Sequence, residues 1–149
     1  MSIRCEIVSQ DRMVWEGDAD IVIVPGESGD MGILPNHAPL LSTLRFGFLK
    51  VRTKDIEEIF TIAGGVIEVQ PDLITVLADS AENVEEIDVA RAEAAKRRAE
   101  ELLKLGPPPD SDAYLRMESA LKRSNLRIEA ARRYRRSQAS RLTVSGQDR

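Results

Sequence analysis

The sequence predicts a fold of the β + α class: an N-terminal antiparallel β-sandwich (flattened barrel) followed by a C-terminal antiparallel two-helix hairpin. Seven of the nine glycines lie before residue 70, among short apolar runs that turn residues separate, as is typical of strands. After residue 86 the strong helix formers alanine, arginine, glutamate and leucine dominate. We therefore expect a β domain over residues 1–86, a helical hairpin over 87–137 and a basic, flexible tail over 138–149.

The first part predicts six strands, each short, rich in Val, Ile or Phe, and bounded by turn chemistry such as Gln70-Pro71-Asp72. They are Ile3 to Val8, Ala19 to Val24, Gly47 to Arg52, Glu58 to Ala63, Val66 to Gln70 and Leu73 to Ala78. Strands at this spacing without helical patterns between them indicate a sandwich. The pair Gly64-Gly65 predicts a bulge or corner, because the glycine spacings of phosphate-binding loops are absent.

The second part predicts two helices. The first opens at Glu86-Ile87-Asp88, where acids suit the positive end of the helix dipole, and runs to about Leu105, before Gly106 and three prolines. Asp110, Ser111 or Asp112 caps the second helix, which continues through Ala113 to about Ser137.

The expected packing faces of the two helices are rich in alanine. They consist of Ile87, Ala90, Ala94, Ala99, Leu102 and Leu103 on the first helix, and Leu115, Ala120, Leu121, Ile128 and Ala131 on the second. Each alanine in place of leucine loses roughly 2 kcal/mol of transfer free energy. The hairpin is therefore expected to form readily but dock weakly, which suits a switch.

Composition and charge exclude several classes of protein. No run of about 18 apolar residues exists, so any membrane association is expected to be indirect, through a partner. Residues 1–17 fit neither a secretory signal nor a transit peptide. The single cysteine, Cys5, excludes an internal disulfide and indicates a reducing compartment.

Charge is unevenly distributed along the chain. Residues 121–149 contain nine Lys or Arg and two acids, a net charge of +7, so the first 120 residues carry −11. The sequence therefore predicts an acidic body with a basic tail.

The single histidine, His37, lies in the stretch GDMGILPNHAPLLS. It has no cysteine neighbour, no second histidine and no E-x-x-H companion, and the chain contains no G-x-S-x-G motif. We therefore predict no metal site and no catalytic residue. A local hydrogen bond and a contact with a partner are the two roles that remain open for His37.

The basic stretch RIEAARRYRRSQASR leaves a second class of function open. Clustered arginines bind phosphate and Tyr134 could stack on a base, which is the alternative of a stand-alone β domain with a nucleic-acid-binding C-terminal helix. Against this alternative, the arginines fall around several faces of a helix and the remainder of the chain is acidic. A solvated helix, or one that meets an acidic protein surface, is favoured, and no nucleic acid is expected.

Three stretches of the chain, taken in order, resemble the epsilon subunit of the F-type (F1Fo) ATP synthase. They are GESGDMGILPNHAPLLS, FTIAGGVIEVQPDLITVLADSAE and EEIDVARAEAAKRRAEELL, with a looser resemblance at ALKRSNLRI. The resemblance implies a non-catalytic subunit of the central stalk in an enzyme that couples hydrogen ion transport to ATP synthesis. It implies a peripheral protein on the cytoplasmic side of the bacterial cell membrane. The β domain then binds the gamma subunit and the c-ring, with Asp30 and His37 at positions of rotor contact.

The same resemblance implies a regulatory hairpin, which alternates between a folded state and an extended one that reaches the alpha and beta subunits and inhibits ATP hydrolysis. Some bacterial members bind ATP on the folded hairpin, so ATP is expected as a regulatory ligand and no cofactor is required. The matching residues are Ile87, Asp88, Arg91 and Ala92 of the motif I-D-x-x-R-A, with Glu82, Arg98, Arg123 and Arg127, and all of them except Ala92 are expected to bind ATP. The residues leave another interpretation open, in which Asp88 caps a helix and Arg91 and Arg98 pair with nearby glutamates.

Two features depart from the family's pattern: the three successive prolines after Gly106 and the arginine-rich end of the chain. They leave open how the two helices align and what the tail does.

Overall fold

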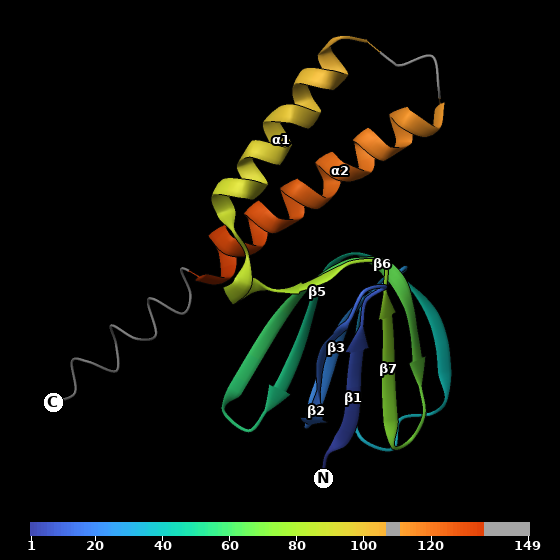
Figure 1. The fold of residues 1–149 in the computed structure, drawn as a ribbon. Helices are drawn as coiled ribbons and strands as arrows, with labels where there is room; N and C mark the ends of the chain where they lie inside the picture. The colour runs from blue at the N-terminus through green and yellow to red at the C-terminus, as the bar shows by residue number, and fades with distance from the viewer. Residues whose placement is uncertain (107–110, 136–149) are drawn as a thin grey trace, which may run out of the picture. The chain divides into compact units, whose positions relative to one another are not determined.

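The computed structural model describes residues 1–106 and 111–135, and these form two compact units. The first unit, Met1–Asn83, is a β-sandwich, and the second, from Val84 onward, is a pair of helices (Figure 1). The units divide three residues before the expected boundary at Glu86, because Val84–Glu86 form a 3-10 turn that packs with the end of the second helix. In the described part of the chain no helix is both long and apolar enough to cross a membrane.

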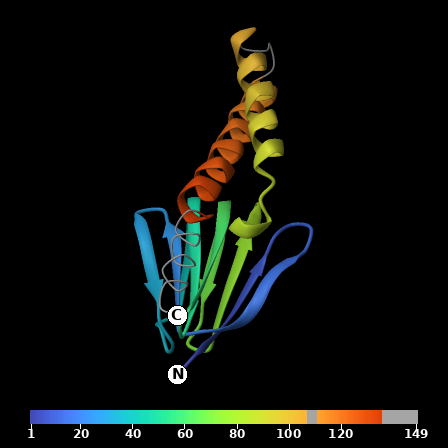
Figure 2. The same ribbon diagram turned by 90° about the vertical axis from the view of Figure 1, so that its left-hand side faces the viewer.

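Eight strands within residues 1–83 make up one sheet with the order β2-β1-β7-β6-β5-β3-β4, and β8 pairs with β6. The strands are β1 (Ile3–Val8), β2 (Met13–Ala19), β3 (Ile21–Gly26), β4 (Gly29–Ile33), β5 (Leu40–Thr53), β6 (Ile56–Val69), β7 (Leu73–Ala78) and β8 (Ala81–Asn83). The neighbours pair antiparallel, apart from β1 and β7, which are parallel. β2 and β4 are the two ends of this path, so the sheet does not close into a barrel. It folds over on itself as a sandwich (Figure 2).

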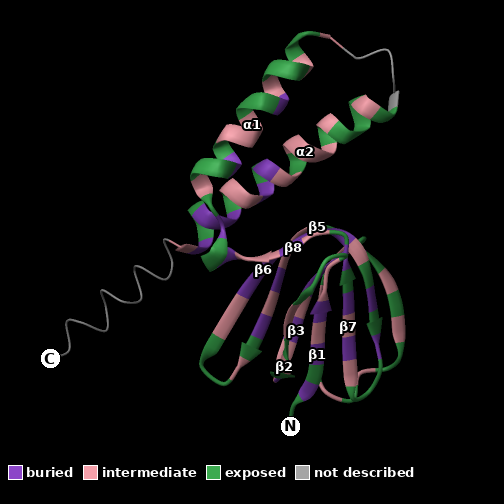
Figure 3. Ribbon diagram, in the orientation of Figure 1, coloured by how far each residue is buried: buried purple, intermediate pink, exposed green. Residues whose placement is uncertain are grey.

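The interior of the sandwich follows from the alternation of side chains along each strand. In β1, for example, Ile3, Cys5 and Ile7 are buried while Arg4 is exposed. Figure 3 shows a similar alternation along β7, whereas β6 contains a continuous run of buried residues, 59–64. Aliphatic residues dominate this core, and Phe60, which is 1% exposed, lies beside Trp15 with 6.3 Å between the ring centroids.

Two of the six expected strands, β1 and β7, have the bounds that the sequence predicts. β3 begins later than expected, and β5 is longer, because its pairing with β6 continues from Thr53 back to Leu40. The expected strands Glu58 to Ala63 and Val66 to Gln70 are one strand, β6, which changes its partner from β8 to β7 at Gly64-Gly65. Both glycines have positive φ, so the predicted corner is confirmed.

The hairpin consists of α1 (Val89–Lys104) and α2 (Ser111–Ala130), which run antiparallel (Figure 1). α1 begins three residues later than expected, because the Asp88 side chain accepts a hydrogen bond from the backbone N–H of Arg91 and caps the helix. α2 is followed by a π-helical turn, Ala131–Arg135. The remainder of the expected second helix, to Ser137, and the tail over 138–149 lie outside the described residues.

The packing face of the hairpin is only partly the expected one. Ala99 and Ala131 are buried as expected, but Ala90, Leu102 and Leu115 are exposed. The buried residues on α1 are Ala92 and Ala99. Of these two, Ala99 belongs to the expected face and Ala92 does not. The expectation of a packing face built on alanine is confirmed for α1.

Candidate functional site

Asp30 is held at an exposed edge of the sandwich by the strand pairing of β4. It lies opposite Pro25 of β3, and its carboxylate is 3.9 Å from the guanidinium of Arg45. Both side chains are more than half exposed, so this ion pair contributes little to stability and leaves the carboxylate accessible.

His37 lies in the turn between β4 and β5, and backbone hydrogen bonds fix that turn. Asn36, with φ of 62°, donates its N–H to the carbonyl oxygen of Pro71 at 3.0 Å, and the His37 N–H donates to Leu34 at 3.2 Å. The imidazole Nδ1 is 2.7 Å from the carbonyl oxygen of Ala38, where Nδ1 carries the proton and donates it. The half-buried ring is thus oriented by its own turn, and its Nε2 atom is left for another contact.

A groove of about 600 Å³ opens directly after this turn, lined by Pro39, Leu40, Leu41, Glu68, Val69 and Gln70. Two large apolar side chains of this region, Leu34 and Leu41, are 56% and 73% exposed. We call this region, with Leu34, His37 and the groove, the end surface. These two leucines make the end surface a candidate for contact with a partner protein. The sequence pattern predicts a strand only from Gly47, so it does not reveal the exposure of Leu41 on the earlier part of β5.

The residues expected to bind ATP fall in both units. Glu82 lies in β8 of the sandwich unit, whereas the other six lie in the hairpin unit. Asp88 is engaged as the cap of α1, and the carbonyl of the buried Ile87 accepts a hydrogen bond from Arg135. On α2, Arg123 donates to the hydroxyl of Ser119 at 3.1 Å. Arg91 and Arg98 are exposed on α1, and the ion pair recorded on that helix joins Lys96 to Glu100 at 3.9 Å.

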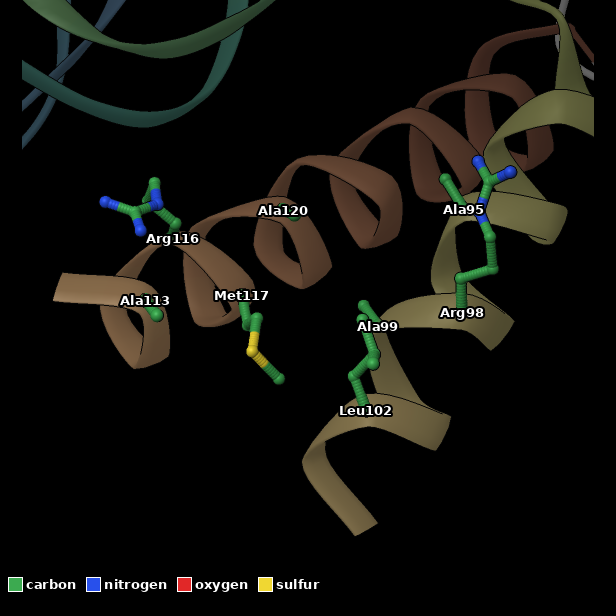
Figure 4. A pocket seen from close by; sticks show the side chains of 8 residues that line it. All are labelled: Ala95, Arg98, Ala99, Leu102, Ala113, Arg116, Met117 and Ala120. Atoms are coloured by element: carbon green, nitrogen blue, oxygen red, sulfur yellow. The ribbon is translucent and has the colours of Figure 1, made fainter. Parts of the chain in front are cut away.

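Between the two helices lies a groove of about 390 Å³, and of the seven expected ATP-binding residues only Arg98 lines it. The groove is lined by Ala95, Arg98, Ala99, Leu102, Ala113, Arg116, Met117 and Ala120. Figure 4 shows the Met117 side chain extending into the gap toward Leu102 and Ala99, whereas Arg116 points away from α1. The groove is thus mainly apolar, and no motif or spacing in the sequence points to its lining residues Met117 and Arg116.

Residues 1–106 and 111–135 contain no group of three or more His, Cys, Asp or Glu side chains that could bind a metal ion. Two arginines of α2 and its π-turn are engaged within the hairpin: Arg123 donates to the hydroxyl of Ser119, and Arg135 donates to backbone carbonyls. These contacts favour structural roles for Arg123 and Arg135 over the alternative of nucleic-acid binding.

Comparison with known families matches the two units separately. The family described as "ATP synthase, Delta/Epsilon chain, beta-sandwich domain" matches residues 2–84, and the corresponding long alpha-helix domain matches residues 85–132. The sequence is 41% identical over 139 residues to an ATP synthase epsilon chain of Dehalococcoides mccartyi, covering 89% of this chain and 94% of that one. It is 42% identical over 131 residues to the epsilon chain of Bacillus licheniformis, covering 88% and 98%.

Solved structures share the fold. A chain of the Euglena gracilis mitochondrial ATP synthase (OSCP/F1/c-ring) aligns with a TM-score of 0.65 and 22% identity, covering 81% of this chain and 76% of that one. A chain of the central stalk/c-ring assembly of the Tetrahymena thermophila mitochondrial ATP synthase aligns with a TM-score of 0.60 and 13% identity, covering 88% and 97%. The matched family regions meet at residues 84 and 85, beside the division between the two units after Asn83.

Proposed function

This chain belongs to the ATP synthase delta/epsilon family, as an epsilon chain, and we propose that it is the non-catalytic central-stalk subunit that joins the gamma subunit to the c-ring. The observation that carries the proposal is the match of both units, in order, to the two domains of one family. In this role the protein lies peripherally on the cytoplasmic side of a bacterial membrane, attached through its partners. It transmits rotation while proton flow drives ATP synthesis.

The end surface of the sandwich is suited to a rotor contact. It combines a turn fixed by hydrogen bonds, the half-buried His37 ring and the exposed leucines 34 and 41. Asp30 adds an accessible carboxylate on β4. Such a contact needs complementary shape and charge and no general base, which agrees with the absence of activating neighbours in the His37 turn.

Capture of the gamma subunit by the immobilised chain tests this role. We expect the full chain, and residues 1–86 alone, to retain gamma, because the sandwich has its own core. Failure of both to retain gamma would sink the rotor assignment.

Single substitutions locate the contact. Asp30→Asn and His37→Ala should weaken binding to the c-ring or gamma while leaving thermal unfolding unchanged, because both side chains make only surface contacts. Asp11→Asn, an exposed turn residue between β1 and β2, is the matched control and should bind like the wild type. Wild-type binding by the first two variants would remove these residues from the interface.

The hairpin is proposed to regulate hydrolysis, by extending toward the alpha and beta subunits and inhibiting the enzyme. Its loose packing supports this proposal: the buried residues on α1 are two alanines, while Leu102 and Leu115 are 51% and 58% exposed. A ligand or partner can shift such an element with a few kcal/mol of differential binding. Removal of the residues after Glu86 should therefore raise ATP hydrolysis by the purified enzyme, and unchanged hydrolysis would contradict the inhibitory role.

ATP is proposed as a regulatory ligand of the folded hairpin. The hairpin carries Arg91, Arg98, Arg123 and Arg127, and phosphate held by arginines of both helices would favour the folded state. Calorimetry with Mg-free ATP should show binding to the wild type, weaker binding to Arg123→Ala, and wild-type binding to Arg97→Ala, an exposed arginine outside the set. Equal heats from the wild type and Arg123→Ala would remove Arg123 from the site.

A further inference from the structure

One arginine joins the end of the second helix to the start of the hairpin. The Nη2 atom of Arg135 donates hydrogen bonds to the carbonyl oxygens of Glu85, at 3.1 Å, and Ile87, at 2.6 Å. These acceptors lie 50 and 48 residues earlier in the chain, immediately before the Asp88 cap of α1. Hydrogen bonds from a charged donor are roughly twice as strong as those between neutral groups.

A change of helix type places Arg135 in this position. α2 ends at Ala130, and the chain continues through the π-helical turn Ala131–Arg135. A π-helical turn is wider than an α-helical one, so it shifts the side chains that follow around the helix axis. Such turns are rare and persist where surrounding contacts stabilise them.

Buried apolar residues surround this contact. Tyr134 and Ala131 of the π-turn are 8% and 7% exposed, and the 3-10 turn Val84–Glu86 packs with them. Val84 and Ile87, on the partner segment, are 1% and 3% exposed. Buried apolar residues thus lie on both of the segments that the two hydrogen bonds of Arg135 join.

The opposite end of the hairpin is much less closely packed. Leu102, Leu105 and Leu115 are 51%, 85% and 58% exposed, and the groove containing Met117 separates the helices there (Figure 4). A smaller groove, of about 230 Å³, also lies beside Arg135, where Val89, Ile128 and Ala131 are among its lining residues. The end near Arg135 differs from the other end in having buried residues on both segments and the two hydrogen bonds of Arg135.

We propose that Arg135 is a latch: its bonds to Glu85 and Ile87 hold the end of α2 against the start of α1, and the hairpin opens only when they break. The family match covers residues 85–132, so the acceptors Glu85 and Ile87 lie inside the matched region and the donor Arg135 lies beyond it. The latch itself concerns the folded hairpin alone, whereas its effect on ATP hydrolysis rests on the proposed function.

Amide hydrogen exchange on the full-length chain tests the latch. Arg135→Met removes the donors and keeps an aliphatic stem, whereas Arg135→Lys keeps the charge but loses the guanidinium fork. Arg132→Met, an exposed arginine on the same turn, makes the same change in net charge and is the matched control. We expect residues 84–104 to exchange about tenfold faster in Arg135→Met, with Arg135→Lys intermediate and Arg132→Met like the wild type. Strands β1 to β7 should be unaffected and serve as the internal reference.

Equal exchange in Arg135→Met and Arg132→Met would overturn the latch. Faster exchange across the strands as well would also overturn it, since the effect would then be general unfolding.

The regulatory consequence is tested in the assembled ATP synthase. Arg135→Met should change ATP hydrolysis by the same enzyme in which removal of the residues after Glu86 raises it. If the truncation acts but Arg135→Met does not, the latch has no regulatory effect, although the proposed function stands. If the truncation has no effect, the proposed inhibition fails while the exchange result still decides the latch.

Discussion

The carboxylate of Asp88 accepts a hydrogen bond of 3.0 Å from the backbone N–H of Arg91 and thereby caps α1. The same two residues belong to the motif that the family resemblance assigns to ATP. One residue is therefore expected to serve two purposes, and substitutions that preserve one purpose can separate them.

Replacing Asp88 by alanine should destabilise α1 by about 1 kcal/mol, the usual cost of losing a capping side chain. Asp88→Ser keeps a capping oxygen and should leave α1 near its wild-type stability, as measured by hydrogen exchange of residues 89–104. Calorimetry then isolates the carboxylate: a loss of ATP affinity in Asp88→Ser would assign it to ligand binding. Wild-type exchange in the alanine variant would show that the cap contributes nothing measurable.

Gly65 should not tolerate any side chain. Its φ is +139°, and an added Cβ would lie 2.3 Å from the carbonyl oxygen of Leu77. We expect Gly65→Ala to lower the free energy of unfolding by about 3 kcal/mol or more, because both backbone strain and a clash with backbone atoms oppose it. Denaturant unfolding followed by the fluorescence of Trp15 measures the change.

Gly32→Ala is the control for Gly65→Ala. An added Cβ there would meet only the Ile21 side chain, at 3.6 Å. Its effect should stay within about 0.5 kcal/mol. Similar unfolding midpoints for the two variants would refute the argument from the corner of β6.

Burial raises the pKa of the Cys5 thiol to about 12, with a smaller contribution from the negative charge of Glu6. The thiol should therefore resist alkylation at pH 8 in the folded protein and react only on unfolding. In the unfolded chain it ionises near pH 9.0, whereas in the folded chain it stays protonated, so its contribution to stability is complete below pH 9.0 and falls as pH rises toward 12.

The predicted slope is about 1.4 kcal/mol per pH unit between these values. Comparing the free energy of unfolding of the wild type with that of Cys5→Ala from pH 8 to 10.5 isolates this contribution. The wild type should lose stability faster than the variant above pH 9. Parallel curves would show that the thiol ionises equally well in the folded state.

The parts of the fold that the sequence predicts are those with a strong local pattern. β1 and β7 alternate cleanly and have the predicted bounds, and the change to helix formers locates the hairpin. The sequence pattern does not predict β2 and β4, which are the edge strands of the sheet. β4 contains two glycines and an aspartate, which disfavour strands, and its pairing with β3 makes it a strand. β8 has three residues and depends in the same way on β6.

The candidate sites likewise divide into features with a local sequence pattern and features that depend on tertiary contacts. The positions of Asp30, His37 and the hairpin arginines follow from motif and spacing, and their proposed roles stay predictions. The exposure of Leu41 depends on the length of β5, which is set by pairing with β6 across the sheet. The contact of Arg135 depends on a π-turn, and the sequence ARRYR suits an α-helix equally well. These features are tertiary, so local propensity could not reveal them.

The parallel pairing of β1 with β7 determines the order in which the protein can fold. Arg4 lies opposite Leu73, so the first strand to leave the ribosome has its inner neighbour nearly seventy residues later. Pairings so distant in sequence are slow to form, because a long loop must close before they stabilise the chain. During synthesis β1 can therefore pair only with β2 until the residues up to Ala78 have emerged, and its apolar side chains stay uncovered by β7 until then.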